Sequence, residues 1–215
     1  MKIFKYFFMD LGRIIYFIAD IIFFRIKKLD ADGKKFTAKI NGGAVICANH
    51  IDFLDPFIIG CAFKTRRVFF LAAEAVMNKK ILAPLLKGIG CIKIDRNISD
   101  IEAIRKSISV LKDGRILAMF PEGGIHRDKE IDSVKSGAAL IAIRAGVPII
   151  PMYTKKRKHW YNRRTVIVGS AVNPNQLCTK KIPSIKDIEA VSDKIRQALL
   201  ECRNTYERMT ENDDI

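Results

Sequence analysis

Short apolar runs alternate with segments of helical spacing along most of the chain. The runs predict strands, and the segments between them predict helices. Strands are expected over residues 67–72, 91–94, 116–120, 147–152 and 165–168, and helices over residues 79–87, 101–111, 135–145 and 184–208. This alternation favours an α/β fold with a mostly parallel or mixed, buried sheet flanked by helices.

Local signals refine several boundaries. Ser99 to Glu102 has the spacing of a capping box, and Gly146 follows the last periodic residue of its helix. Residues 36–40 and 43–47 flank Asn41-Gly42, a dipeptide typical of a type I′ turn, so the pattern predicts a hairpin there. Its second strand would end just before Asn49-His50.

The first 28 residues are strongly apolar but are interrupted by Asp10, Arg13 and Asp20, which disfavours a simple spanning helix. On a helical projection the polar residues form a narrow stripe and the apolar ones fill the rest. We expect a helix that lies in a membrane interface. A helix docked on the protein's own core and a tilted or paired spanning segment stay open as alternatives. The predicted organisation is an interfacial helix over residues 1–30 and one domain over residues 31–215.

The composition adds a strong positive charge, formally +15 over 215 residues. Nucleic acid, an anionic membrane surface, and acidic substrates or carrier proteins could each explain it, and charge alone does not choose among them. The five cysteines are odd in number and widely spaced, which predicts reduced thiols. The three histidines lack the close spacing of zinc ligands, so no metal site is expected.

Candidate chemistry begins at Asn49 to Pro56, where His50 precedes Asp55 by five residues after an apolar strand. A carboxylate at that position can bind one imidazole nitrogen and leave the other free to accept a proton. Taken alone, the pair is equally compatible with a core or capping histidine. A second block, Phe120 to Gly123, follows another apolar strand.

Four ordered blocks resemble the glycerophospholipid acyltransferase family, which includes 1-acylglycerol-3-phosphate acyltransferases of bacterial membranes. The blocks are Asn49 to Asp55, Gly90 to Arg96, Phe120 to Gly123, and Val147 to Pro151. They match the family's N-H-x4-D, G-x-I-x-(V/I)-D-R, F-P-E-G and V-P-(I/V)-(I/V)-P patterns over residues 44–152. A chance match of the ordered set is remote.

The resemblance implies a membrane-associated O-acyltransferase of phospholipid biosynthesis. His50 and Asp55 would form the catalytic pair, and acceptor binding is expected at Asn49, Arg96, Glu122 and Gly123. The acyl donor would be acyl-CoA or an acyl carrier protein (ACP) thioester, without a cofactor. The acceptor would be a lysophosphatidate-like lipid at the cytoplasmic face of the cell membrane, where the enzyme would be peripheral or monotopic. The alternatives are a surface cation for Arg96 and a salt-bridged carboxylate for Glu122.

Two departures bear on the acceptor. The family usually continues its third block as F-P-E-G-T-R-S, whereas this chain has Gly124 and Ile125, and Ala73 stands where many relatives have lysine. Arg127 or Lys135 could replace the missing cation, or the acceptor could be another lyso-lipid or a hydroxylated aminolipid. His126 is expected to be a surface loop residue.

Basic clusters over residues 64–67 and 155–164 contribute much of the excess charge, and Trp160 and Tyr161 lie inside the second. They favour attraction to anionic lipid, to the phosphates of coenzyme A or to an acidic carrier protein. A solvated basic face is the alternative. A non-catalytic basic module that binds membranes or nucleic acid would require four coincidental motifs, so no nucleic-acid partner is expected.

Overall fold

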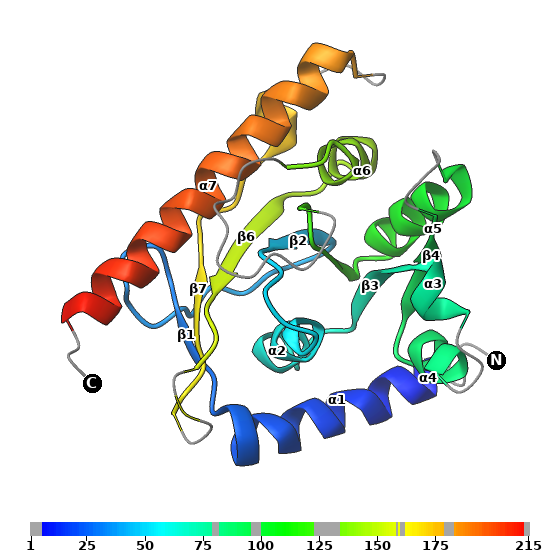
Figure 1. The fold of residues 1–215 in the computed structure, drawn as a ribbon. Coiled ribbons are helices and arrows are strands. Elements are labelled where there is room, and N and C mark those ends of the chain that lie inside the picture. The colour runs from blue at the N-terminus through cyan, green and yellow to red at the C-terminus, as the bar shows by residue number, and fades with distance from the viewer. Residues whose placement is uncertain are drawn as a thin grey trace.

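The apolar runs form a seven-stranded sheet in the computed structural model, which describes residues 6–78, 82–95, 100–122, 134–157, 159, 162–178 and 183–212. Five strands, in the order β6-β2-β5-β3-β4, are parallel, and β1 and β7 run antiparallel to them at the β6 edge (Figure 1). The strands are β1 Lys27–Leu29, β2 Ala44–Ala48, β3 Val68–Ala73, β4 Cys91–Ile94, β5 Ile116–Met119, β6 Ile149–Thr154 and β7 Thr165–Val168. The expected mixed sheet is confirmed.

Helices cover both faces of this sheet, which explains why its central strands are apolar throughout. Alternate residues of β2 join two different cores, Val45 and Cys47 on one face and Ala44, Ile46 and Ala48 on the other. The helical elements are α1 Phe7–Ala19, η2 Asp20–Phe24, α2 Asp55–Ala62, α3 Glu74–Met77, α4 Leu82–Gly88, α5 Ile101–Lys112, α6 Gly137–Ala145, η3 Pro174–Gln176 and α7 Ile185–Asn212. Helices α5, α6 and α7 pack against the first core and α2 against the second.

The predicted hairpin around Asn41-Gly42 is wrong. Residues 36–40 form no strand, and β2 pairs in parallel with β5 on one side and β6 on the other. With both edges of β2 occupied, the preceding segment cannot pair with it, so long-range packing overrides the local turn signal. Gly42 still adopts a positive φ of 73°.

Local signals mark the ends of three helices, α5, α6 and α7. The cap of α5 is Asp100, one residue later than the predicted box that begins at Ser99, because Asp100 Oδ1 accepts a hydrogen bond of 2.9 Å from the Ala103 amide. Ser99 itself lies outside the described residues. At α7, Ser184 and Asp187 exchange hydrogen bonds as a capping pair. Gly146 ends α6 in the left-handed conformation with φ 68°.

The N-terminal helix α1 packs on the domain through its polar stripe. Asp10 accepts two hydrogen bonds, of 2.8 and 2.6 Å, from the Arg67 guanidinium, and this contact holds the Asp10 carboxyl pKa below its usual value. Arg13 donates to the Lys64 carbonyl at 3.0 Å, and Asp20 forms an ion pair with Lys64. The charges that interrupt the apolar segment therefore attach it to the protein.

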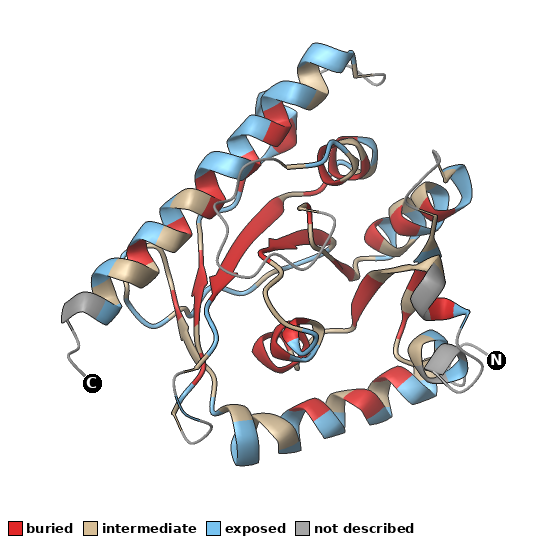
Figure 2. Ribbon diagram, in the orientation of Figure 1, coloured by how far each residue is buried: buried red, intermediate tan, exposed pale blue. Residues whose placement is uncertain are grey.

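The apolar side of the same segment faces outward. Its large side chains are between 45% and 64% exposed: Phe7, Phe8, Leu11, Ile14, Ile15, Phe17, Ile18, Ile21, Ile22 and Phe23. Exposed residues recur along the whole of α1 in Figure 2, whereas β2 and β6 are buried throughout. None of the helices within the described ranges combines the length and apolar character needed to cross a bilayer.

The 1–30 and 31–215 division stays a prediction. The chain already enters the sheet at Lys27, and the helix ends in the π-helical turn η2. Arg25 then adopts a left-handed conformation with φ 46°, and the Asp20 side chain accepts a 2.7 Å hydrogen bond from the Ile26 amide. This turn connects α1 to the edge strand β1.

The close contact between α1 and α2 can be tested at Gly60, because a Cβ there would lie 2.7 Å from the Tyr16 ring. We expect Gly60→Ala to force α1 outward and to lower the free energy of unfolding by about 1–3 kcal/mol. Gly137→Ala is the control, since nothing lies within 4 Å of its Cβ position. Equal stability of the two variants in urea unfolding would contradict the proposed packing constraint.

Candidate active site

The site lies where parallel strands end at one edge of the sheet. Residues Asn49 and His50 directly follow β2, Phe120 follows β5, and Thr154 is the last residue of β6. Because β2 pairs in parallel with both β5 and β6, these residues come to the same edge. Carboxyl ends of parallel strands are the usual place for a site in such sheets.

One carboxylate oxygen organises the turn between β2 and α2. Asp55 Oδ2 lies 3.0 Å from His50 Nδ1 and accepts hydrogen bonds of 2.7 and 2.8 Å from the amides of Ile51 and Asp52. The Asp55 side chain is 2% exposed and the His50 side chain 13%. Contact with Asp55 Oδ2 places the ring proton of His50 on Nδ1.

The second carboxylate oxygen faces a buried cation. Arg164 Nη2 lies 3.5 Å from Asp55 Oδ1, an ion-pair distance longer than a hydrogen bond, and the Arg164 side chain is only 7% exposed. Burial lowers the pKa of the Arg164 guanidinium, and the Asp55 charge acts in the opposite direction. Arg164 therefore supplies positive charge to Asp55 inside the protein.

Arg164 is itself fixed by a buried network that includes Asn49. Its Nε donates to Thr154 Oγ1 at 3.0 Å, and Thr154 Oγ1 donates to the Thr165 carbonyl at 2.9 Å. The Asn49 side chain exchanges hydrogen bonds of 2.9 and 3.0 Å with the Thr154 backbone. Asn49, predicted to bind substrate, thus connects β2 to the end of β6.

Sequence reasoning missed Arg164 and Thr154. Arg164 was assigned to a basic cluster, and no local pattern separates it from Arg163, which is exposed and donates to the Arg25 carbonyl at 3.2 Å. The available signal was its position immediately before an apolar strand, Thr165 to Val168, where alternate side chains are expected to point into the protein.

Phe120 brings the third sequence block next to the histidine. Its ring stacks on the His50 imidazole, with centroids 4.0 Å apart and planes at 18°. Among the residues that the structure describes, no hydrogen bond is recorded to His50 Nε2. In the tautomer that Asp55 selects, Nε2 has the free lone pair that a general base needs.

The remaining predicted acceptor residues are only partly placed. Glu122 follows Phe120-Pro121 and is partly exposed. Burial raises the pKa of Tyr153, a residue of β6, to about 12. Arg96 and Gly123 lie outside the described residues, as do Gly124, Ile125, His126, Arg127, Trp160 and Tyr161.

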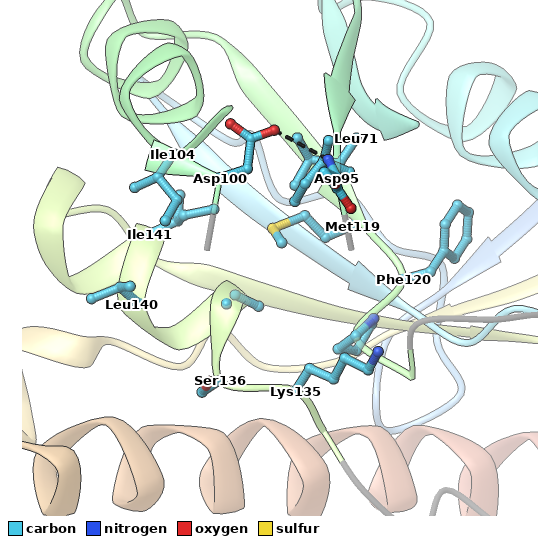
Figure 3. A pocket seen from close by; sticks show the side chains of 14 residues that line it. Leu71, Asp95, Asp100, Ile104, Met119, Phe120, Lys135, Ser136, Leu140 and Ile141 are labelled. Atoms are coloured by element: carbon cyan, nitrogen blue, oxygen red, sulfur yellow. Dashed lines mark hydrogen bonds between the residues drawn. The ribbon is translucent and has the colours of Figure 1, made fainter. Parts of the chain in front are cut away.

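A cavity of about 330 Å³ adjoins Phe120 (Figure 3). Its walls are mainly apolar side chains of β3, β4, β5, α5 and α6, among them Leu71, Ile94, Ile104, Met119 and Ile141. Lys135, Asp95 and Asp100 supply charge to the cavity lining. Phe120 thus contacts both the cavity and the His50 ring.

Other candidate chemistry is limited in the described part of the chain. No three His, Cys, Asp or Glu side chains gather there in a way that could hold a metal ion. All five cysteines are free thiols, and burial raises the pKa of Cys47 and of Cys202 to about 12. Ionised thiolates are therefore disfavoured at these positions.

Residues 26–155 match the family model described as Acyltransferase. A 1-acyl-sn-glycerol-3-phosphate acyltransferase of Bacillus subtilis is 24% identical over 79% of this chain and 85% of its own length. Another enzyme of that name, from Streptococcus pneumoniae, is 32% identical over 71% of this chain, although the match spans only 57% of that protein.

The fold is also found in a solved structure. The 1-acyl-sn-glycerophosphate acyltransferase PlsC from Thermotoga maritima superposes with a TM-score of 0.61 and 18% identity, over 90% of this chain and 79% of that one. This likeness concerns the fold. With the family model covering more than half of the sequence, the chain belongs to the acyltransferase family.

Proposed function

We propose that this enzyme transfers a fatty acyl group from an acyl-CoA or acyl-ACP thioester to the free hydroxyl of a lysophosphatidate-like acceptor in phospholipid biosynthesis. The observation that carries the proposal is the His50–Asp55 pair, 3.0 Å apart, at the strand edge of an acyltransferase-family fold. The names of the relatives from Bacillus subtilis and Streptococcus pneumoniae support a lysophosphatidate acceptor.

In the proposed mechanism, His50 Nε2 removes the proton of the acceptor hydroxyl as its oxygen attacks the thioester carbonyl. The tetrahedral intermediate then collapses, the C–S bond breaks, and the leaving sulfur takes the proton from His50. Asp55 keeps Nδ1 protonated and stabilises the imidazolium that forms between these steps. Proton, nucleophile and leaving group are thus accounted for without an acyl-enzyme intermediate or a cofactor.

The surroundings of His50 suggest where each substrate would bind. The cavity behind Phe120 has the apolar lining that suits an acyl chain. Glu122, with Arg96 and Gly123, would hold the glycerol and phosphate of the acceptor. Lys135 lines the same cavity and supplies a cation that could replace the arginine missing after Gly123. Asn49 would act by fixing the strand ends rather than by touching the acceptor.

The alternative acceptors are another lyso-lipid or a hydroxylated aminolipid. Gly124 and Ile125 support these alternatives, because the arginine that usually binds the phosphate is absent at this point of the sequence. The acyl-transfer chemistry at His50 would be the same. Turnover of a panel of lyso-acceptors, with products identified by mass, decides between them, and no turnover of lysophosphatidate would exclude the leading acceptor.

We also propose that the enzyme is a peripheral or monotopic protein of the cytoplasmic face of the cell membrane. The apolar face of α1 and η2 supports this, because it projects outward while the polar stripe is attached to the domain. Such a surface suits the boundary between lipid headgroups and acyl chains. The net positive charge of +15 would add attraction to anionic lipid.

For the catalytic base, we expect His50→Ala to lower kcat for acyl transfer by about 10²–10⁴-fold, the usual contribution of a general base. The exposed His159 provides the control, and His159→Ala should keep nearly all activity. Unfolding curves verify that both variants are folded. Retention of more than a tenth of the activity by a folded His50→Ala enzyme would rule out the proposed base.

For the buried cation, we expect Arg164→Met to lower the free energy of unfolding by about 3 kcal/mol, because Asp55 would lose its partner inside the protein. Activity should fall as well, since Asp55 would be held less firmly. Arg163→Met removes the same charge from an exposed neighbour and should change stability by less than about 0.5 kcal/mol. Equal effects in urea unfolding would show that the ion pair is unimportant.

For membrane binding, we expect the double variant Ile14→Ser and Ile18→Ser to reduce partitioning onto phosphatidylcholine vesicles at least about tenfold, since two large apolar groups would be lost from the interface. The control, Ile101→Ser with Ile185→Ser, changes two exposed isoleucines away from α1, 63% and 75% exposed. Vesicle sedimentation measures both. A similar loss in the control would argue against a role specific to α1.

A further inference from the structure

A second, basic hollow is lined by residues of η2, of β1 and of the last turn of α2, and His50 is not among them. It encloses about 450 Å³. Five cationic side chains and one carboxylate line it, which leaves a formal charge of +4: Lys27, Lys28, Lys35, Lys64, Arg163 and Asp20. Cations gathered in a concave surface create a positive potential that attracts anions.

The single carboxylate does not neutralise this charge. Asp20 is paired with Lys64. Lys28 is held instead by the Ala62 carbonyl, at 2.9 Å from Nζ, and by the rings of Phe36 and Phe63, whose centroids lie 5.3 and 5.1 Å away. Within the described ranges, no ion pair is recorded between Lys28 and a carboxylate.

Lys28 is subject to the positive charge of its neighbour Lys64. Its ammonium is half-buried, and burial, together with repulsion from Lys64, lowers its pKa. A bound anion would offset that repulsion and accept hydrogen bonds from several ammonium groups. Of these neighbouring charges, only that of Asp20 raises the pKa of Lys28.

The neighbouring surface indicates which anion fits. Asp20 lines the hollow, and the next residues along η2, Ile21 and Ile22, are each 59% exposed. Because Asp20 directly precedes these side chains in the sequence, a lipid whose acyl chains lay against them would bring its phosphate near the hollow. We propose that the hollow binds the phosphate of an anionic phospholipid headgroup, an inference that rests on the proposed membrane association.

This lipid is not the acyl acceptor. Ala62, the hydrogen-bond partner of Lys28, ends α2, whereas Asp55 begins it. The seven residue steps between them span about 10 Å at the rise of an α-helix. A phosphate held at Lys28 would therefore lie at the opposite end of α2 from the Asp55–His50 pair, and we assign it to a lipid other than the acceptor. The hollow instead positions the enzyme on an anionic bilayer.

The test compares two adjacent exposed lysines, of which Lys35 lines the hollow and Lys34 does not. Binding is measured on vesicles of phosphatidylcholine alone and with one quarter phosphatidylglycerol. We expect Lys35→Met to reduce partitioning onto the anionic vesicles about fivefold, and Lys34→Met to reduce it less than about twofold. Lys28→Met should act like Lys35→Met, and thermal unfolding verifies that the variants are folded.

The outcomes separate this proposal from the others. Equal losses for Lys34→Met and Lys35→Met would indicate diffuse attraction and overturn it. Binding of glycerol 3-phosphate that depends on Lys35, without an effect on vesicles, would assign the hollow to a free phosphate and overturn the lipid proposal. Failure of the membrane proposal itself would appear as unchanged binding to phosphatidylcholine alone when Ile14 and Ile18 are replaced. Acyl transfer between soluble substrates should be unaffected by Lys35→Met.

Discussion

The Asp55 carboxylate is the constraint on which the site depends. One of its oxygens accepts from the His50 ring and from two consecutive backbone amides, so it sets both the imidazole orientation and the path of the chain into α2. The other oxygen faces Arg164, which is bonded in turn to Thr154 at the end of β6. The ends of β2 and β6 and the start of β7 are thereby fixed around one buried anion. An ionised carboxylate without these partners would be strongly unfavourable in the interior.

The excess positive charge has two different uses in the described residues. Much of the cluster at residues 64–67 attaches the N-terminal helix to the domain, through Lys64 to Asp20 and Arg67 to Asp10. From the second cluster, Arg157 lies over the Phe24 ring and Arg164 lies beside Asp55. Lys27, Lys28 and Lys35 instead remain gathered at the basic hollow. A count of charges does not show whether a cation is paired inside the protein or faces an open anion site. That depends on which side of its strand or helix faces the protein.

Sequence patterns predicted the parts of the fold that depend on local periodicity. The apolar runs of β3, β4, β5 and β7 and the helices α5, α6 and α7 lie close to their expected ranges. Local periodicity does not predict which strands pair with each other. Asn41-Gly42 is a good turn signal, but β2 lies between β5 and β6 and pairs with them. At the site, His50 and Asp55 are close in sequence, so their contact could be anticipated. Arg164 reaches Asp55 across 109 positions of the chain, and only the sheet order brings them together.

The attachment of α1 through its polar stripe also has a geometric consequence. Arg67 holds α1 at Asp10, Lys64 holds the following turn η2 at Asp20, and Tyr16 packs against Gly60 between these two contacts. A helix held at three points cannot swivel relative to the sheet. Any surface on which its apolar side lies therefore fixes the tilt of the whole domain. A molecule embedded in that surface then reaches His50 by diffusing within the plane of the surface. The angle at which it approaches His50 is set by the fixed tilt of the domain.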